Sequence, residues 1–189
     1  YPGAKNYTNS LELLEADCDI LIPAALENQI TKDNAPRLKA KIIAEGANGP
    51  VTQNAEQILL QNKVMIIPDL FLNAGGVTVS YFEWLKNLSH VHFGRMEKRC
   101  QEMSNNELVG AVEKITGKNL DAKQRKVLTH GADEIDIVRS GLEETMIHAY
   151  NDIREIRRQD TRITDLRTAA FVCGIRKLGV AYQNLGIFP

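Results

Sequence analysis

Residues 41–50 read KIIAEGANGP, a short apolar run that ends in glycine, asparagine and proline. A run this short, bounded by Gly and Pro, is typical of a buried strand. Two similar runs, residues 20–22 and 64–67, lie about 22 residues to either side. Thr52 can cap a helix between the second and third runs. Strands that alternate with helices predict βαβ units and a parallel sheet, so we expect an α/β fold.

The predicted sheet is about half of a doubly wound sheet, because only three strands with their crossovers can be found. The glycine fingerprint G-x-G-x-x-G, which follows the first strand of a dinucleotide-binding fold, is absent. Two interpretations follow. The fold either does not bind a dinucleotide, or its opening half lies outside these residues.

Helices dominate the rest of the chain. Residues 77–88 predict a helix with a broad apolar face. Residues 93–103 are polar and predict irregular structure, and residues 104–107 (SNNE) predict a capping box for a short helix that ends near Gly117. A second small helix is expected within residues 120–130.

The last fifty residues predict two helices. An apolar stripe at spacings of four, three, four and three defines the first, and its members are Leu142, Met146, Ala149, Ile153 and Ile156. Thr164 or Asp165 can cap the second, which is apolar around most of its circumference and is therefore expected to be buried.

Composition sets the protein class. Of the 189 residues, 43% are hydrophobic and 25% are charged, and the formal net charge is −1, which is typical of a globular protein with a real core. We expect no nucleic-acid partner, because there is no basic excess, and no membrane partner, because no apolar run approaches the roughly 20 residues of a span. Three cysteines far apart in sequence favour free thiols in a reducing compartment. The sequence begins without Met or a signal-like segment, so a targeting sequence could precede it.

The loops after the strands are the expected ligand site, because open parallel sheets bind ligands at the carboxyl ends of their strands. These loops carry the small or amide residues Ala24, Gly46, Ala47, Asn48 and Asn73. Small residues let a flat ring approach the backbone, and an asparagine amide, which both donates and accepts, suits a carboxamide such as that of nicotinamide. The alternative is that Asn48 and Gly49 only form a turn.

Asn73, Val77 and Ser80 share one stripe if a helix starts near Gly75. Ser80 would then lie about one turn from the helix amino terminus, where a hydroxyl could bind a substrate carboxylate. The alternative is a serine packed between helices.

Histidines give weaker signals. His90 and His92 are spaced by two without a carboxylate or thiolate pattern beside them, which favours a solvated helix end over a metal site, so we expect no metal. Lys86 most simply belongs to a solvated face, and a phosphate site is the minority interpretation.

Several ungapped stretches together resemble the hexameric glutamate dehydrogenases of the animal type. These stretches are residues 15–25 (EADCDILIPAA), 44–50 (AEGANGP), 66–69 (IIPD), 73–84 (NAGGVTVSYFEW) and 165–170 (DLRTAA). The resemblance implies a Rossmann-like domain and the reversible oxidative deamination of L-glutamate to 2-oxoglutarate and ammonia with NAD or NADP.

The resemblance also implies roles for individual residues. Asn48 and Asn73 would line the nicotinamide end of the cofactor, and Ala24, Gly46 and Ala47 would lie along the same edge. Val77 and Ser80 would contact the substrate, with Ser80 on its side-chain carboxylate. The family's catalytic lysine and aspartate and its glycine-rich turn would lie upstream of Tyr1, so no catalytic residue is expected here and the isolated chain should be inactive.

The resemblance further implies an organisation into four parts. Residues 1–76 would form a partial cofactor domain, 77–92 a helix at the substrate cleft, 93–138 an antenna of the animal and ciliate kind, and 139–189 the pivot helix and the C-terminal helix. It implies a homohexamer in the mitochondrial matrix. A nucleotide effector site would involve Lys86, Arg139 and His148, of which the last two depart from the animal pattern.

Two alternatives remain open at this point. The chain could be a non-catalytic assembly subunit derived from a glutamate dehydrogenase. It could also belong to a dehydrogenase for leucine, phenylalanine or valine, which Ser80 disfavours, because an apolar side chain offers a hydroxyl nothing to bind.

Overall fold

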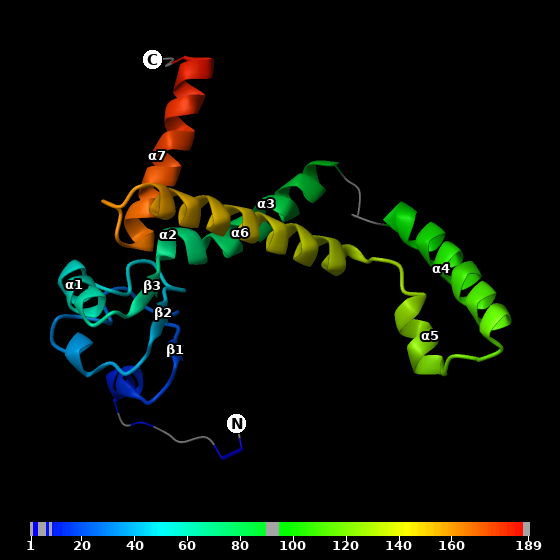
Figure 1. Cartoon of the computed structure of the whole chain (residues 1–189), viewed down its shortest axis with the longest axis horizontal. Helices are drawn as coiled ribbons and strands as arrows, with labels where there is room; N and C mark the ends of the chain where they lie inside the picture. The colour runs from blue at the N-terminus through cyan, green and yellow to red at the C-terminus, as the bar shows by residue number, and fades with distance from the viewer. Residues whose placement is uncertain (1, 4–6, 8, 90–94, 187–189) are drawn as a thin grey trace. The chain divides into compact units, whose positions relative to one another are not determined.

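The computed structural model describes residues 2–3, 7, 9–89 and 95–186 and divides into two compact units. One unit comprises Tyr1–Val77 and Met146–Pro189, and the other Thr78–Thr145. Figure 1 labels the helices and strands of both units.

The first unit contains the predicted parallel sheet. Its strands are β1 (Ile20–Leu21), β2 (Ile42–Ala44) and β3 (Met65–Ile67), in the order β1-β2-β3. Helix α1 (Gln53–Gln61) begins at Thr52, whose Oγ1 accepts the N–H of Ala55 at 3.4 Å. The prediction of strands, order of elements and cap is therefore confirmed for β2, α1 and β3.

The start of the sheet differs from the prediction. The segment between β1 and β2 holds only one 3-10 turn, η2 (Ala35–Arg37), and not a helix, while another 3-10 helix, η1 (Ser10–Glu15), precedes β1. Strand β1 is not buried as predicted, since Ile20 is 55% exposed. It is an edge strand of the described sheet, and the segment between β1 and β2 supplies no α-helix to cover a face of the sheet beside it.

One core of the first unit lies between the sheet and α1. Ile30, Ile43, Leu59 and Ile66 are its largest buried side chains. This core fixes the positions of the carboxyl ends of the strands relative to one another, as a ligand site at that edge requires.

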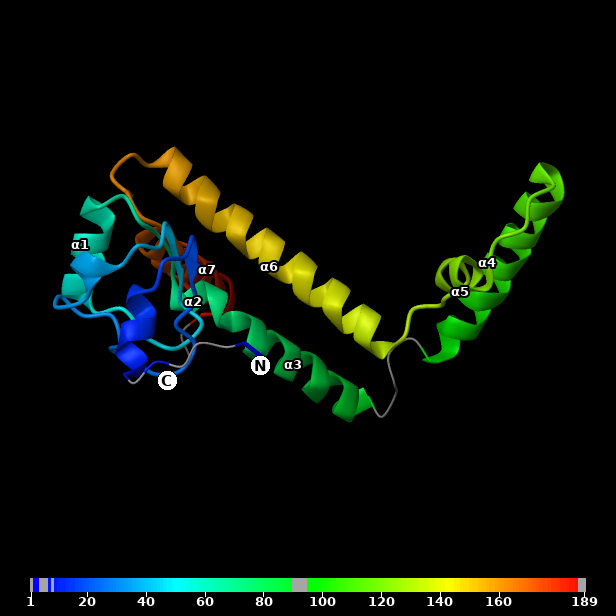
Figure 2. The same cartoon turned by 90° about the horizontal axis from the view of Figure 1, so that it is seen from below.

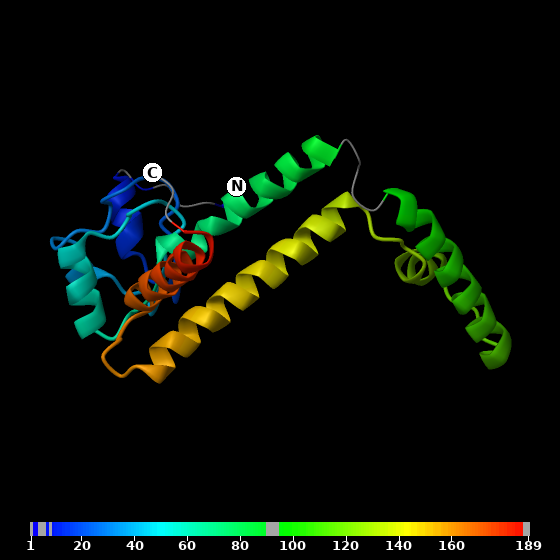
Figure 3. The same cartoon turned by 90° about the horizontal axis from the view of Figure 1, so that it is seen from above.

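A second core joins the end of α6 (Glu134–Gln159) to the start of α7 (Leu166–Leu185). Ile153 packs there with the buried residues of α7, and α7 also contacts β3 and the short helix α2 (Asp69–Leu72) (Figure 3). Asp165 is the cap, and its Oδ1 accepts the N–H of Thr168 at 2.7 Å. The predicted stripe and cap are thus confirmed.

The prediction that α7 is buried is wrong for its second half. Its buried residues are confined to 166–173, whereas Ile175 is 65% and Leu185 71% exposed. In the unit as described, the contacts of α7 with β3 and α2 cover only the first turns of the helix.

The described residues of the second unit are mainly helical. It holds most of α3 (Ala74–Ser89), all of α4 (Arg95–Thr116) and α5 (Ala122–Leu128), and the start of α6. Helices α4 and α5 lie side by side (Figure 2). The predicted helix over residues 77–88 and the small helix within 120–130 are confirmed.

The prediction of irregular structure is wrong for residues 95–103, and the prediction of a capping box at residues 104–107 is also wrong, because both segments lie inside α4. Residues 93 and 94 lie outside the described residues. Residues 97–102 are mostly strong helix formers, so a helix that begins before residue 104 continues through the predicted cap. Gly117, with φ +66°, ends α4 as predicted. The true capping box belongs to α5, between Asp121 and Gln124.

No helix in the described part of the chain combines the length and apolar character needed to cross a bilayer.

Candidate functional site

The three loops at the carboxyl edge of the sheet are joined by main-chain hydrogen bonds. The N–H of Ala47 donates to the carbonyl of Pro23 at 2.9 Å, and the N–H of Glu45 donates to that of Ile67 at 3.1 Å. Both bonds form at or just after the last residues of the strands, so they continue the hydrogen-bond ladder of the parallel sheet into the loops. The structure therefore brings the loop of Ala24 against the loop that carries Gly46, Ala47 and Asn48.

Glycine at position 46 has a steric reason. A Cβ built on Gly46 would lie 3.0 Å from Cβ and 3.4 Å from Cα of Ala24. These contacts are tighter than side chains ordinarily make, so the loops approach this closely only because residue 46 lacks a side chain and residue 24 has a small one.

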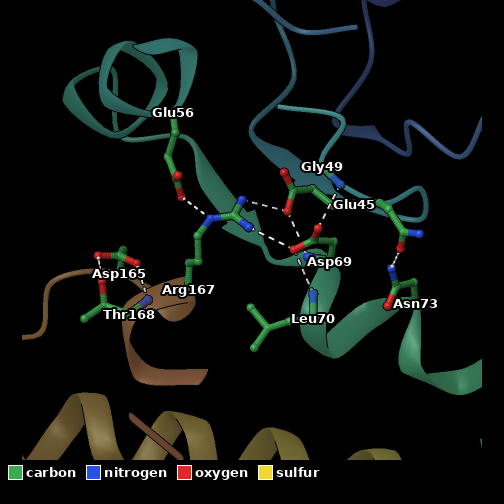
Figure 4. Close-up of polar contacts among 10 residues, drawn as sticks. Glu45, Gly49, Glu56, Asp69, Leu70, Asn73, Asp165, Arg167 and Thr168 are labelled. Carbon is green, nitrogen blue, oxygen red and sulfur yellow. Dashed lines mark hydrogen bonds and ion pairs between the residues drawn. The ribbon is translucent and has the colours of Figure 1, made fainter. Parts of the chain in front are cut away.

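Asn48 and Asn73 come together across the edge. The Nδ2 group of Asn73 donates to Oδ1 of Asn48 (Figure 4). Asn48 is exposed and Asn73 is half-buried. The pair uses one donor and one acceptor, so the amide nitrogen of Asn48 and the carbonyl oxygen of Asn73 can serve a ligand with both kinds of group.

An arginine that the sequence did not single out lies beneath these loops. Arg167, at the start of α7, donates from Nε to Glu56 at 2.8 Å, from Nη1 to Asp69 at 2.9 Å and from Nη2 to Glu45 at 2.7 Å (Figure 4). We call these four residues the Arg167 cluster. The sequence contains a signal for this cluster. Arg167 is the one charged residue among the apolar positions 166–173, and a charge on a buried helix face needs a partner.

The cluster carries three carboxylates for one guanidinium. Glu45 is 0% exposed, and its Oε1 has no hydrogen-bond partner among the described residues. Burial raises the pKa of Glu45 above its ordinary value, although the charge of Arg167 and the N–H of Asp69 oppose that rise.

Asp69 and Arg167 are held in their charged forms. Burial acts to raise the pKa of Asp69, but hydrogen bonds from the N–H groups of Gly49 and Leu70 and the charge of Arg167 outweigh it and lower that pKa. Burial acts to lower the pKa of Arg167, and the hydrogen bond to Glu56 and the charge of Glu45 raise it above the ordinary value instead. An ionised Asp69 is therefore available to hold the loop after β2.

The predicted substrate residues lie on α3. Val77, which ends the first unit, and Ser80, in the second unit, are both exposed. Only Asn73 separates α2 from α3, and its carbonyl accepts the N–H of Gly76 at 3.1 Å. The start of α3 thus offers fewer unused N–H groups to an anion than the sequence predicted.

The predicted effector residues are distributed over both units. Lys86 donates to Glu134 at 2.6 Å within the second unit, where Arg139 is exposed, while exposed His148 belongs to the first unit. His90 and His92 lie outside the described residues.

His130 has a partner that its sequence context did not predict. Its Nε2 lies 2.9 Å from Oδ2 of Asp136, and this hydrogen bond is the main reason that the pKa of Asp136 falls to about 2. The main-chain N–H groups of Asp133 and Asp136 each donate to the other's carboxylate, at 3.0 and 3.4 Å, so this group is explained as a cap at the start of α6.

Known proteins resemble this chain in sequence and in fold. The family described as Glutamate/Leucine/Phenylalanine/Valine dehydrogenase matches residues 1–139. A protein of Dictyostelium discoideum named "Glutamate dehydrogenase, mitochondrial" is 53% identical over 186 residues, 98% of this chain. A "Probable glutamate dehydrogenase" of Sinorhizobium fredii is 47% identical over 94% of the chain.

The fold agrees as well. The crystal structure of glutamate dehydrogenase from Peptoniphilus asaccharolyticus covers 90% of this chain, with a TM-score of 0.62 and 26% identity, and the chain covers 32% of that structure. The chain spans 37% and 40% of the lengths of the two sequence relatives. The resemblance drawn from the sequence and the partial Rossmann-like α/β fold are confirmed. The chain belongs to the Glutamate/Leucine/Phenylalanine/Valine dehydrogenase family.

Proposed function

We propose that these residues form the carboxy-terminal part of a glutamate dehydrogenase, which deaminates L-glutamate reversibly to 2-oxoglutarate and ammonia with NAD or NADP. The observation that carries the proposal is the Asn48–Asn73 pair at the carboxyl edge of a parallel sheet. The similar proteins of Dictyostelium and Sinorhizobium support the choice of glutamate.

The residues fit the nicotinamide end of such a cofactor. The exposed amide of Asn48 and the carbonyl of Asn73 match the donor and acceptor of a carboxamide, and the close approach of Ala24 to Gly46 leaves the edge without bulky side chains. When bound, the cofactor supplies the acceptor for the hydride. Relatives are named both as NAD-specific and as NADP-specific enzymes, so the proposal includes either cofactor.

The substrate residues of the proposal are Val77 and Ser80. The hydroxyl of Ser80 would donate to the side-chain carboxylate of glutamate, while Val77 would contact its aliphatic part. A leucine, phenylalanine or valine substrate has no group there that would accept this hydrogen bond.

An assay of the complete polypeptide tests the proposed activity. Oxidation of NADH or NADPH should depend on 2-oxoglutarate and ammonium together, and 2-oxo acids with apolar side chains should be poor substitutes. The isolated 189 residues should not turn over, because the acid–base residues implied by the resemblance lie elsewhere. A measurable rate from the isolated chain, or a preference for an apolar 2-oxo acid, would contradict the proposal.

The proposal extends to assembly and location. Residues 93–138 would be an antenna and residues 139–189 the pivot and terminal helices of a homohexamer in the mitochondrial matrix, following residues 1–76 of the cofactor domain and 77–92 at the substrate cleft. The exposed apolar residues Leu108, Val112 and Ile115 on α4 support a contact surface there. Deletion of residues 93–138, followed by measurement of the mass in solution, tests it: a hexamer that persists unchanged would argue against the role of the antenna.

The proposal includes regulation by a nucleotide. Lys86, Arg139 and His148 supply cationic or titratable groups, of which Lys86 is held by Glu134. An ADP titration of the complete enzyme should change its rate, and a flat titration would remove these residues from the proposal.

A further inference from the structure

We infer that Arg167 is a positioning residue: from α7 it sets the conformation of the loop at residues 46–50, and through that loop the cofactor contact of Asn48. The inference rests on the proposed function for the role of Asn48. No reacting atom needs to touch Arg167, because it acts through two carboxylates.

The first connection passes through Asp69. Nη1 of Arg167 donates to Asp69 Oδ1 at 2.9 Å, and the opposite oxygen, Oδ2, accepts the N–H of Gly49 at 2.8 Å. The carbonyl of Asp69 accepts the N–H of Asn73 at 3.0 Å. One residue therefore binds the neighbour of Asn48 and the main chain of Asn73, and Arg167 holds that residue in place.

The second connection passes through Glu45. Nη2 of Arg167 donates to Glu45 Oε2 at 2.7 Å, and the same oxygen accepts the N–H of Asp69 at 2.8 Å. Glu45 precedes Gly46 directly and is fully buried. The two ends of the 46–50 loop are thus anchored to one guanidinium.

Electrostatics makes the guanidinium necessary for this arrangement. Without it, Glu45 and Asp69 would lie in contact in a poorly solvated place, where two carboxylates repel each other and one takes up a proton or moves away. Movement of Asp69 would release the N–H of Gly49. A lysine cannot replace the arginine, because an ammonium is a point donor that lacks the planar fork reaching three carboxylates.

Glu56 provides a control within the cluster. It accepts from Nε of Arg167 at 2.8 Å, as Asp69 accepts from Nη1, and it is similarly buried. Glu56 belongs to α1, however, and in the described structure its only recorded side-chain hydrogen bond is to Arg167 and not to the loop. Loss of Glu56 should weaken the cluster without releasing the loop.

The experiment compares Arg167→Lys, Asp69→Asn, Glu56→Gln and the exposed control Arg162→Lys in the complete dehydrogenase. Two quantities are measured: hydrogen–deuterium exchange of a peptide covering residues 46–50, and the KM values for cofactor and for glutamate. Arg167→Lys and Asp69→Asn should speed exchange of this peptide and raise the cofactor KM roughly tenfold, while the glutamate KM changes by less than about twofold.

Glu56→Gln and Arg162→Lys should leave exchange at 46–50 and both KM values close to wild type. Unchanged exchange in Arg167→Lys and Asp69→Asn would overturn the inference. If exchange increases but the cofactor KM does not, Arg167 positions the loop and the proposed cofactor role of Asn48 is wrong. If Arg167→Lys does not fold, the comparison of Asp69→Asn with Glu56→Gln tests the inference, with exchange at residues 46–50 and the KM values as the measurements.

Discussion

The main-chain N–H of Gly49 donates to Oδ2 of Asp69 at 2.8 Å, and this bond ties the loop after β2 to the start of α2. Asn48 precedes Gly49, and Asn73 follows Asp69 by one helical turn. The two asparagines meet because the carboxylate of Asp69, twenty residues after Gly49, fixes the turn that contains Asn48.

Gly46→Ala should lower the free energy of unfolding by about 1–3 kcal/mol, because the new Cβ would lie 3.0 Å from Cβ and 3.4 Å from Cα of Ala24, and neither atom is the end of a flexible side chain. Urea denaturation measures the change. Gly174→Ala is the matched control: it lies in α7 with nothing within 4 Å of an added Cβ, and it should raise stability by up to about 1 kcal/mol. Equal effects at the two positions would show that the close approach to Ala24 does not matter.

Asn48→Ala should raise the KM for cofactor in the complete enzyme by about tenfold, since it removes one ligand hydrogen bond and leaves the Asn73 amide without its partner. The KM for glutamate should stay near the wild-type value. Asn151→Ala, at an exposed position of α6, is the comparison. A cofactor KM that is the same in both variants would place the nicotinamide elsewhere.

Glu45→Gln should become more stable relative to wild type as the pH rises. Because burial raises the pKa of Glu45, the folded state binds this proton more tightly than the unfolded state, where the ordinary value is 4.5. Ionised Glu45 therefore lowers the free energy of unfolding above its folded pKa, and this penalty disappears as the pH falls toward the unfolded value. The glutamine carries no such charge.

The measurement for Glu45 is urea denaturation of wild type and variant at a series of pH values from the ordinary value of 4.5 upward. Asp69 contributes in the opposite direction, because its pKa is lowered and its stabilisation is lost as the pH falls through the folded value. Glu107→Gln, an exposed position on α4, is the control. A stability difference for Glu45→Gln that does not change with pH would mean that Glu45 is charged in neither state or equally in both.

Ile153→Ala should lower the free energy of unfolding by about 2–5 kcal/mol, because Ile153 is 6% exposed in the core between α6 and α7. Ile175→Ala, on the exposed second half of α7, should change stability by no more than about 0.5 kcal/mol. Thermal unfolding of both variants gives the comparison. A large loss for Ile175→Ala would show that another part of the complete protein covers this face.

Local patterns were sufficient for most elements. The three strands, the Thr52 and Asp165 caps and the stripe containing Ile153 followed from apolar spacing and from polar caps, which act over a few residues. The wrong predictions concerned features that depend on adjacent segments or on tertiary packing. Residues 104–107 have the composition of a cap but continue a helix begun earlier, and the apolar circumference of α7 did not reveal how much of it the chain itself covers.

The sequence by itself determined that small and amide residues follow parallel strands, and therefore that Ala24, Gly46, Ala47, Asn48 and Asn73 share one edge, because the carboxyl ends of parallel strands point the same way. Only the tertiary structure decided that Asn48 bonds to Asn73 and that Arg167 supports both through Glu45 and Asp69. These contacts join residues more than twenty positions apart. Their formation depends on how α7 packs on the sheet and on which buried charges pair with one another. The spacing of residues along the chain predicts neither.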